Sequence, residues 1–271
     1  MSVCIYCGQE GKVTREHILP SFIYKYQYST SSEKTIGWQE KSKKIISDEA
    51  KIKDVCDHCN NVILSELDGY VKNMLEHSGF FTQCFLKEQV NINYNYSLIS
   101  RWLLKVAFNS SRASEKKLDF FDKYKDIILG QDSDLSGFAI SAGLLKPLKL
   151  TPSEVEKYGH DLNTDPSGYA NPFFGRISWV EFESSECAVK QIVIGAAIFH
   201  IIAFNTDLLR ARKKALIKEY LEVFKGMALI RKNESKINIT QTPLTFIDSM
   251  KNHMLRREVE PYLIELSKNF N

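Results

Sequence analysis

Two Cys-x-x-Cys pairs constrain the fold of this chain more than any other feature of its sequence. The pairs are Cys4 with Cys7 and Cys56 with Cys59, and about 48 residues lie between them. In a chain without an export signal, such pairs indicate metal binding rather than disulfides. Four thiolates complete a tetrahedral Zn²⁺ site and leave no open position. The sequence therefore predicts one structural zinc site that ties the N-terminus to the segment near residue 60.

Composition restricts the functional class only loosely. The 271 residues are 44% hydrophobic and 25% charged, and the net charge of +3 permits a nucleic-acid partner without indicating one. The N-terminus lacks the basic and apolar regions of a secretory signal. The longest apolar run, residues 192–204, is shorter than the roughly 20 residues that span a bilayer and is expected to form two buried strands. We therefore expect a cytoplasmic protein with no membrane partner, in which the lone Cys84 and Cys187 are buried, inert thiols.

Hydrophobic periodicity predicts helices in the first half and an α+β pattern in the second. Amphipathic helices are expected over residues 60–77 and 97–111, the second with Arg101 and Lys105 facing outward. The polar stretch 110–117 is expected to be a linker. We also expect a hairpin at 35–46 and strands at 135–145, 175–184 and 189–204. Further helices are expected at 118–129, 207–224, 244–255 and 259–270. A short helix is expected to begin with a capping box of Thr151 and Glu154.

Part of the sequence resembles a known family. The residues CIYCG…TREHILP…VCDHCNN…LD resemble HNH endonucleases of the zinc-bound ββα-metal type. In that family an acidic residue and a His follow the first cysteine pair, then an apolar pair and Pro, and an Asn or His follows the second pair directly. The resemblance covers residues 4 to about 72, roughly a quarter of the chain. It implies a metal-dependent enzyme that hydrolyses phosphodiester bonds in DNA.

The resemblance gives roles to three residues. His17 matches the general base, and a neutral imidazole is suited to deprotonating water. Glu16 and Asn60 match the ligands of a catalytic Mg²⁺ or Mn²⁺, which prefers oxygen atoms. Asn61 is a second candidate for the distal ligand, although the family position directly follows the cysteine. On the residues alone, Glu16-His17 is also an ordinary surface dipeptide and Asn60 an ordinary helix cap.

The local geometry places a condition on this site. Adjacent strand residues point to opposite faces, so Glu16 and His17 are expected where a strand bends or begins. Asp68, which matches the LD of the family on the first helix, either orients a neighbouring group or faces solvent. His200, inside an apolar strand, is expected to be a satisfied core histidine, whereas His160 and His253 lack metal-like spacing.

Several basic and aromatic residues are candidates for contacts with nucleic acid. Arg210, Lys214 and Lys218 recur at i, i+4 and i+8 of a predicted helix, and such stripes give salt-sensitive affinity for phosphates. A solvated helix face explains the same pattern. Tyr24, Tyr26, Tyr28 and Trp38 either stack on bases or pack against the hairpin. The other basic candidates are Arg15, Lys43 and Lys44.

The predicted fold class is α+β. A zinc-bound ββα-metal unit, treble-clef-like, occupies residues 1–78, a helical connecting region residues 79–134, and an α+β region for recognition or oligomerisation residues 135–271. The leading hypothesis is an HNH endonuclease that cuts DNA, in the manner of mobile-element or anti-phage defence effectors, with a regulatory protein or a second copy as a further partner. The alternative is a zinc-stabilised module that binds nucleic acid or protein without catalysis. The conjunction of Glu16, His17 and Asn60 favours the enzyme.

Overall fold

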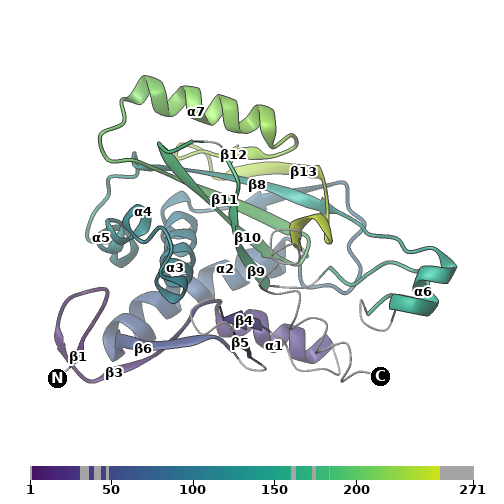
Figure 1. Cartoon of the computed structure of the whole chain (residues 1–271), viewed down its shortest axis with the longest axis horizontal. Helices are drawn as coiled ribbons and strands as arrows, with labels where there is room; N and C mark the ends of the chain where they lie inside the picture. Colours follow the sequence, from purple (N-terminus) through teal and green to yellow (C-terminus); the bar gives the residue numbers. More distant parts are fainter. Residues whose placement is uncertain are drawn as a thin grey trace.

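The chain has a mixed α+β fold in the computed structural model, with four cysteines clustered near the N-terminus. The structure describes residues 2–30, 37–39, 44–46, 49–159, 163–172, 175–182 and 184–250. Within these residues, a seven-stranded sheet separates α7 (Arg210–Val223) from α2 (Ser65–His77) and α3 (Tyr96–Ser114) (Figure 1). Side chains therefore pack in two layers, one on each face of the sheet.

The sheet is built mostly from antiparallel pairs. Its strands follow the order β7-β13-β8-β11-β10-β9, with β12 paired to β8, and only β13 and β8 are parallel. β10 and β11 are buried along their whole length, which confirms the two strands expected from the apolar run at 192–204. The bounds are β7 (Gln89–Asn93), β8 (Phe138–Lys146), β9 (Gly175–Val180), β10 (Cys187–Ile194), β11 (Ala197–Phe204), β12 (Ala228–Ile230) and β13 (Lys236–Thr245).

Each face of the sheet has its own hydrophobic cluster. Leu216 and Tyr220 of α7 pack with Val189 and Ile202 on one face. On the other face, a larger core continues from the sheet through α3 and α2 to Cys4 and Cys59. The cysteine-bearing segment thus shares one core with the sheet.

The N-terminal part contains three short strand pairs. β1 (Ser2–Val3) pairs with β2 (Glu10–Gly11), and β3 (Val13–His17) pairs with β6 (Lys51–Cys56). In the sequence, α1 (Ser21–Thr30) and the antiparallel pair of β4 (Gly37–Gln39) and β5 (Lys44–Ile46) lie between β3 and β6. The strand pair confirms the hairpin expected at 35–46. β6 leads through the second cysteine pair into a π-helical turn, η1 (Cys59–Leu64), and then into α2. This confirms the amphipathic helix expected after the cysteines.

The remaining helices are short. The helix expected at 118–129 is divided into α4 (Asp119–Asp122) and α5 (Lys125–Leu129). α6 (Pro152–Tyr158) begins with the expected capping box, in which the Thr151 N–H donates to Glu154 Oε2 over 2.8 Å. A 3₁₀ turn, η2 (Asp248–Met250), follows β13.

Two expectations about α3 are wrong. The stretch 110–117 is not a linker, because α3 continues to Ser114 and its Ser111 is fully buried. Lys105 does not face outward, because its side chain has no exposed surface. In both stretches a basic residue of α3 contacts a carboxylate of the cysteine-bearing segment, Arg112 with Asp54 and Lys105 with Glu16, so a charged side chain did not indicate exposure to solvent.

The helices expected at the C-terminus are not found in the residues that the structure describes there. Leu244 and Thr245 belong to β13, where Thr245 pairs with Lys146 of β8, so the helix expected at 244–255 does not begin there. Residues 251–255 of that helix, the helix expected at 259–270, His160 and His253 lie outside the described residues. No helix in the described part of the chain is long and apolar enough to cross a membrane.

Candidate functional site

The four paired cysteines converge on one point. Their Sγ atoms all lie within 4.8 Å of one another, and Sγ of Cys7 is 3.8 Å from Sγ of Cys56. A tetrahedral zinc ion with Zn–S bonds of about 2.3 Å places its sulfurs about 3.8 Å apart. Cys4 and Cys59 are buried, and Cys7 and Cys56 are half-buried. The arrangement therefore fits a closed site for a metal ion such as zinc.

Hydrogen bonds and charge also fit a metal site. The amide of Cys56 donates to Sγ of Cys4 over 3.3 Å, and the amide of Cys59 donates to Sγ of Cys56 over 3.5 Å. Burial opposes ionisation of Cys4, but the Cys56 amide and further backbone N–H groups lower its pKa to about 7. Burial and the neighbouring sulfurs raise the pKa of Cys59. Without a metal ion, burial and mutual repulsion oppose ionisation of all four thiols together. A bound cation stabilises all four thiolates.

The cysteine cluster holds a strand pair against a helix. β3 and β6 are antiparallel, with a register shift between Thr14 and Arg15, and β6 ends at Cys56. The chain then passes through Cys59 into η1 and α2. The order is thus two antiparallel strands, β3 and β6, and then a helix. Glu16 and His17 form the end of β3.

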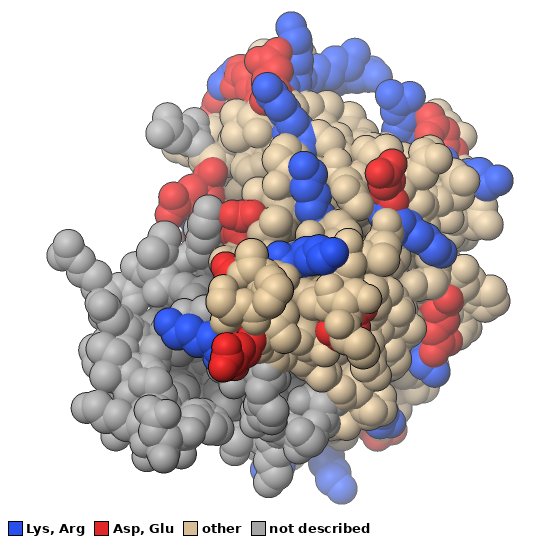
Figure 2. All heavy atoms as spheres, turned by 90° about the vertical axis from the view of Figure 1, so that its right-hand side faces the viewer, with Lys and Arg blue, Asp and Glu red and all other residues tan. Residues whose placement is uncertain are grey.

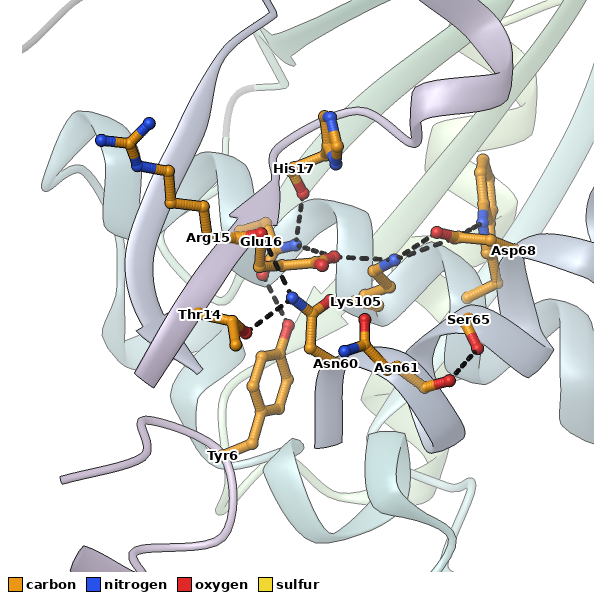
Figure 3. Close-up of polar contacts among 12 residues, drawn as sticks. Tyr6, Thr14, Arg15, Glu16, His17, Asn60, Asn61, Ser65, Asp68 and Lys105 are labelled. Atoms are coloured by element: carbon orange, nitrogen blue, oxygen red, sulfur yellow. Dashed lines mark hydrogen bonds and ion pairs between the residues drawn. The ribbon is translucent and has the colours of Figure 1, made fainter. Parts of the chain in front are cut away.

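Glu16 points into the protein. Its Oε1 lies 2.8 Å from Lys105 Nζ and accepts from Asn109 Nδ2 over 3.3 Å (Figure 3). Lys105 Nζ also donates to both oxygens of Asp68, each over 2.8 Å, and Trp102 Nε1 donates to Asp68 Oδ1 over 2.9 Å. Of the two readings kept open for Asp68, the structure favours the one in which it orients a neighbouring group.

Lys105 is therefore a buried cation between two carboxylates. Burial disfavours its charge, but Asp68 and Glu16 outweigh burial and raise the pKa of Lys105 above its usual value. The ammonium stays charged at neutral pH. The helical periodicity around Lys105 did not indicate that this side chain is buried between carboxylates, because those carboxylates come from distant parts of the chain.

His17 makes a different set of contacts. Its Nε2 lies 2.6 Å from Glu49 Oε2, and Lys51 Nζ lies 2.8 Å from the same oxygen. Burial opposes ionisation of Glu49, but hydrogen bonds from Lys51 and His17 lower its pKa. An ionised carboxylate only accepts hydrogen bonds, so Nε2 carries the ring proton and Nδ1 keeps a free lone pair when His17 is neutral. Sequence reasoning missed Glu49, which carries no motif of its own.

Glu16 and His17 leave β3 in different directions. Glu16 is buried and faces Lys105, whereas His17 is half-buried and its ring points away from Lys105 (Figure 3). Asn109 connects the two residues, because its Nδ2 donates to Glu16 Oε1 and, over 3.0 Å, to the backbone oxygen of His17. Asn109 also accepts from the Tyr6 hydroxyl over 2.5 Å. Helix α3 thus fixes the end of β3.

The structure separates the two candidate asparagines. Asn60 Nδ2 donates to Thr14 Oγ1 over 2.8 Å and to the backbone oxygen of Arg15 over 3.1 Å, which leaves its Oδ1 as the atom for a cation. Asn61 is exposed and donates to Asp57 Oδ1 over 2.6 Å. Only Asn60 contacts β3 beside Glu16.

The candidate nucleic-acid residues do not form one surface. Arg210, Lys214 and Lys218 are exposed on α7, across the sheet from β3 (Figure 1). Lys218 lies 3.9 Å from Glu222, and Figure 2 shows acidic side chains among the basic ones at the top of the molecule, where α7 lies. Arg15 is exposed on β3. Lys43 and the side chain of Lys44 lie outside the described residues, as does the side chain of Trp38.

The lone cysteines and the tyrosines differ in environment. Cys187 is buried as expected, but Cys84 is half-buried, so that expectation was wrong for Cys84. Tyr24 is buried, and Tyr26 packs edge-on against Phe81 with ring centroids 4.9 Å apart. For these two tyrosines the structure favours packing over base stacking, although Phe81 lies outside the hairpin, and Tyr28 is exposed.

Among the described residues, the four cysteines are the only group of three or more His, Cys, Asp or Glu side chains that converge closely enough to bind a metal ion. Comparison of the chain with models of known families, with curated proteins and with solved structures found no match.

Proposed function

We propose that the chain is a metal-dependent endonuclease of the HNH type that acts on DNA. The observation that carries the proposal is the position of His17. It lies at the end of the first of two antiparallel strands, the second strand leads through the four-cysteine cluster into a helix, and Glu49 orients the ring of His17. This order of strand, strand and helix, with His17 at that point, is what the resemblance to ββα-metal nucleases requires.

His17 acts as the general base in this proposal. With Nε2 bound to Glu49, Nδ1 accepts a proton from water, and the hydroxide attacks the phosphorus of a phosphodiester. The carboxylate of Glu49 stabilises the imidazolium that forms, because it lies 2.6 Å from Nε2. The attacked phosphodiester loses its leaving oxygen, and one strand of DNA is cut.

Glu16 and Asn60 would hold a divalent cation. Lys105 and Asn109 occupy Oε1 of Glu16, so Oε2 is the oxygen available to Mg²⁺ or Mn²⁺, together with Oδ1 of Asn60. Outer hydrogen bonds of this kind commonly orient a ligating carboxylate. Bound there, the cation would supply stabilisation of negative charge on the phosphate and the leaving oxygen. Zinc in the cysteine cluster has a structural role only, because four thiolates fill its coordination.

The same resemblance supports a cytoplasmic effector of a mobile element or of anti-phage defence. A regulatory protein or a second copy of the chain is the expected further partner. These statements rest on analogy with the family rather than on the geometry of the site.

A second function is favoured by one specific observation. Lys105 already forms ion pairs with both Glu16 and Asp68, and the described residues hold no second metal cluster besides the cysteines. On that basis the N-terminal part is a zinc-stabilised module that binds nucleic acid or protein without cutting it. The two functions differ in whether a divalent cation has any role beyond zinc.

The two asparagines offer a matched test. We expect the zinc-loaded chain to nick supercoiled plasmid only with added Mg²⁺ or Mn²⁺. Asn60→Ala should raise the Mg²⁺ concentration needed for half-maximal cleavage by about 10- to 100-fold, as expected for loss of a ligand interaction. Asn61→Ala should leave it unchanged. Cleavage that is independent of added metal, or equal effects of the two substitutions, would contradict the metal assignment. A gel shift without cleavage by any variant would support the binding module instead.

A further inference from the structure

A row of buried polar side chains crosses the sheet beneath α7. Ser178, Gln191, His200 and Ser141 lie opposite one another on β9, β10, β11 and β8. Gln191 bonds to Ser178 Oγ over 3.1 Å and to His200 Nε2 over 3.1 Å. The Tyr220 hydroxyl lies 2.6 Å from His200 Nδ1 and 2.7 Å from Ser141 Oγ. Burial lowers the pKa of His200 to about 3. The row is neutral and hydrogen-bonded, which confirms His200 as a satisfied core histidine.

Arg176 lies next to this row, but its side chain lacks some of its hydrogen-bond partners. It precedes Ser178 by two positions on β9, so the two residues share a face of the strand. Its Nη2 donates to Ser249 Oγ over 2.5 Å, and its guanidinium lies 4.5 Å from the centre of the Phe246 ring. Nε and Nη1 are buried and have no hydrogen-bond partner among the described residues. Three N–H groups therefore lack an acceptor.

The missing partner is a negative charge. A guanidinium keeps its charge, and a buried charge without a partner is costly. Burial lowers the pKa of Arg176 to about 9, so the group is still a cation at neutral pH. Arg112 and Arg212 differ, because each contacts a carboxylate, Asp54 and Glu186 respectively. Among the described residues, no carboxylate forms an ion pair with Arg176, whose partners there are the Ser249 hydroxyl and the Phe246 ring.

We propose that Arg176 is the main ligand of an anion-binding site between β9 and η2, which takes a phosphate or carboxylate group. The planar guanidinium matches both oxyanions. Ser178, on the same face of β9, accepts from Gln191 Nε2, so its hydroxyl proton is a neutral donor for the same anion, whereas Ser249 Oγ donates to the Phe246 carbonyl. β9 is the end strand of the sheet, and Arg176 as a residue is only half-buried, so the site borders solvent.

The strand that carries Arg176 packs on the segment that follows His17, but with its other face. A Cβ atom on Gly175 would approach Ile23 Cγ2 to 2.6 Å and Leu19 Cδ1 to 3.1 Å, so the start of β9 packs tightly on that segment. Adjacent residues of a strand point to opposite faces, so an anion bound to Arg176 lies on the face shared with Ser178 and away from α1. The proposal stands on Arg176 alone and does not depend on the endonuclease.

Thermal unfolding of the full zinc-loaded chain tests the site, with inorganic phosphate and acetate as separate probes at constant ionic strength. We expect a saturable rise of Tm with one of these anions in the wild type, and the more effective one identifies the ligand group. Arg176→Met should show no saturable rise, and Arg231→Met, which changes an exposed arginine, should respond like the wild type. Arg176→Lys should bind at least about tenfold more weakly, because an ammonium lacks the planar fork.

A second result separates binding from general salt effects. Without added anion, Arg176→Met should unfold at a Tm no lower than that of the wild type, since it removes an unpaired buried charge. The proposal is overturned by the absence of a saturable shift with either anion, or by equal shifts in the wild type and Arg176→Met. If Arg176→Met does not fold, unaltered affinity in Arg176→Lys, measured by isothermal titration, overturns it equally.

Discussion

Replacement of Lys105 by Met tests whether a buried cation joins β3 to α2 and α3. Met has a similar length but no charge, so the substitution leaves Glu16 without its counter-charge. The Glu16 side chain is only 4% exposed, whereas Asp68 is 24% exposed and is partly compensated by water. Removal of one partner of a buried pair costs about 3–5 kcal/mol. Because whole domains are stable by only about 5–15 kcal/mol, this is a large fraction of the total.

The pH of the measurement follows from the sign of the shift. The folded pKa of Lys105 is raised above its ordinary 10.5, so its stabilisation is complete below that value and is lost only as the pH rises through the raised pKa. At pH 7 the whole effect is present. Denaturant unfolding of the zinc-loaded chain at this pH should show the loss for Lys105→Met. The exposed Lys72→Met, which removes a surface pair with Glu76, should change stability by less than about 1 kcal/mol.

A double substitution identifies the cause. Glu16→Gln combined with Lys105→Met removes both charges, and the pair should be more stable than Lys105→Met alone. The reasoning is refuted if Lys105→Met costs less than about 1 kcal/mol, or if the double variant loses the sum of the two single losses.

Two further predictions concern the cysteine cluster and the buried histidine. Cys4→Ser should abolish binding of one zinc per chain and lower Tm, whereas Cys84→Ser should retain the zinc. Elemental analysis measures the zinc content, and thermal unfolding measures Tm. Full zinc content in Cys4→Ser would contradict the four-thiolate site. His200 has a folded pKa of about 3 against an ordinary 6.5, so stability should fall as the pH drops below 6.5, by up to about 1.4 kcal/mol per pH unit. His200→Gln should lose this slope between pH 6.5 and 5 in denaturant titrations, and an unaltered slope would mean that His200 is not held neutral.

Local patterns predicted the features that local chemistry decides. The spacing of the cysteines indicated a shared metal site, and the apolar run at 192–204 indicated a strand pair. The capping box at Thr151 was visible because a helix start depends on residues three positions apart. Each cysteine pair, the apolar run and the capping box can be recognised from residues that are close together in the sequence.

The contacts of the site escaped prediction because they join distant residues. Lys105 is 89 positions from Glu16, and Glu49 is 32 positions from His17. Helical periodicity assigned Lys105 to the solvent, since a buried lysine is rare without a partner. The choice between Asn60 and Asn61 likewise needed the position of Thr14, which lies 46 positions from Asn60. No pattern in one sequence gives such pairings.

The rate of plasmid nicking by His17→Ala tests the central claim most directly. Wild type, His17→Ala and the exposed His77→Ala are compared at saturating Mg²⁺, each with one zinc per chain. Loss of a general base predicts a rate about 10²- to 10⁴-fold lower for His17→Ala, with His77→Ala equal to the wild type. Equal nicking by all three proteins would show that His17 is not the base and would contradict the proposed nuclease site.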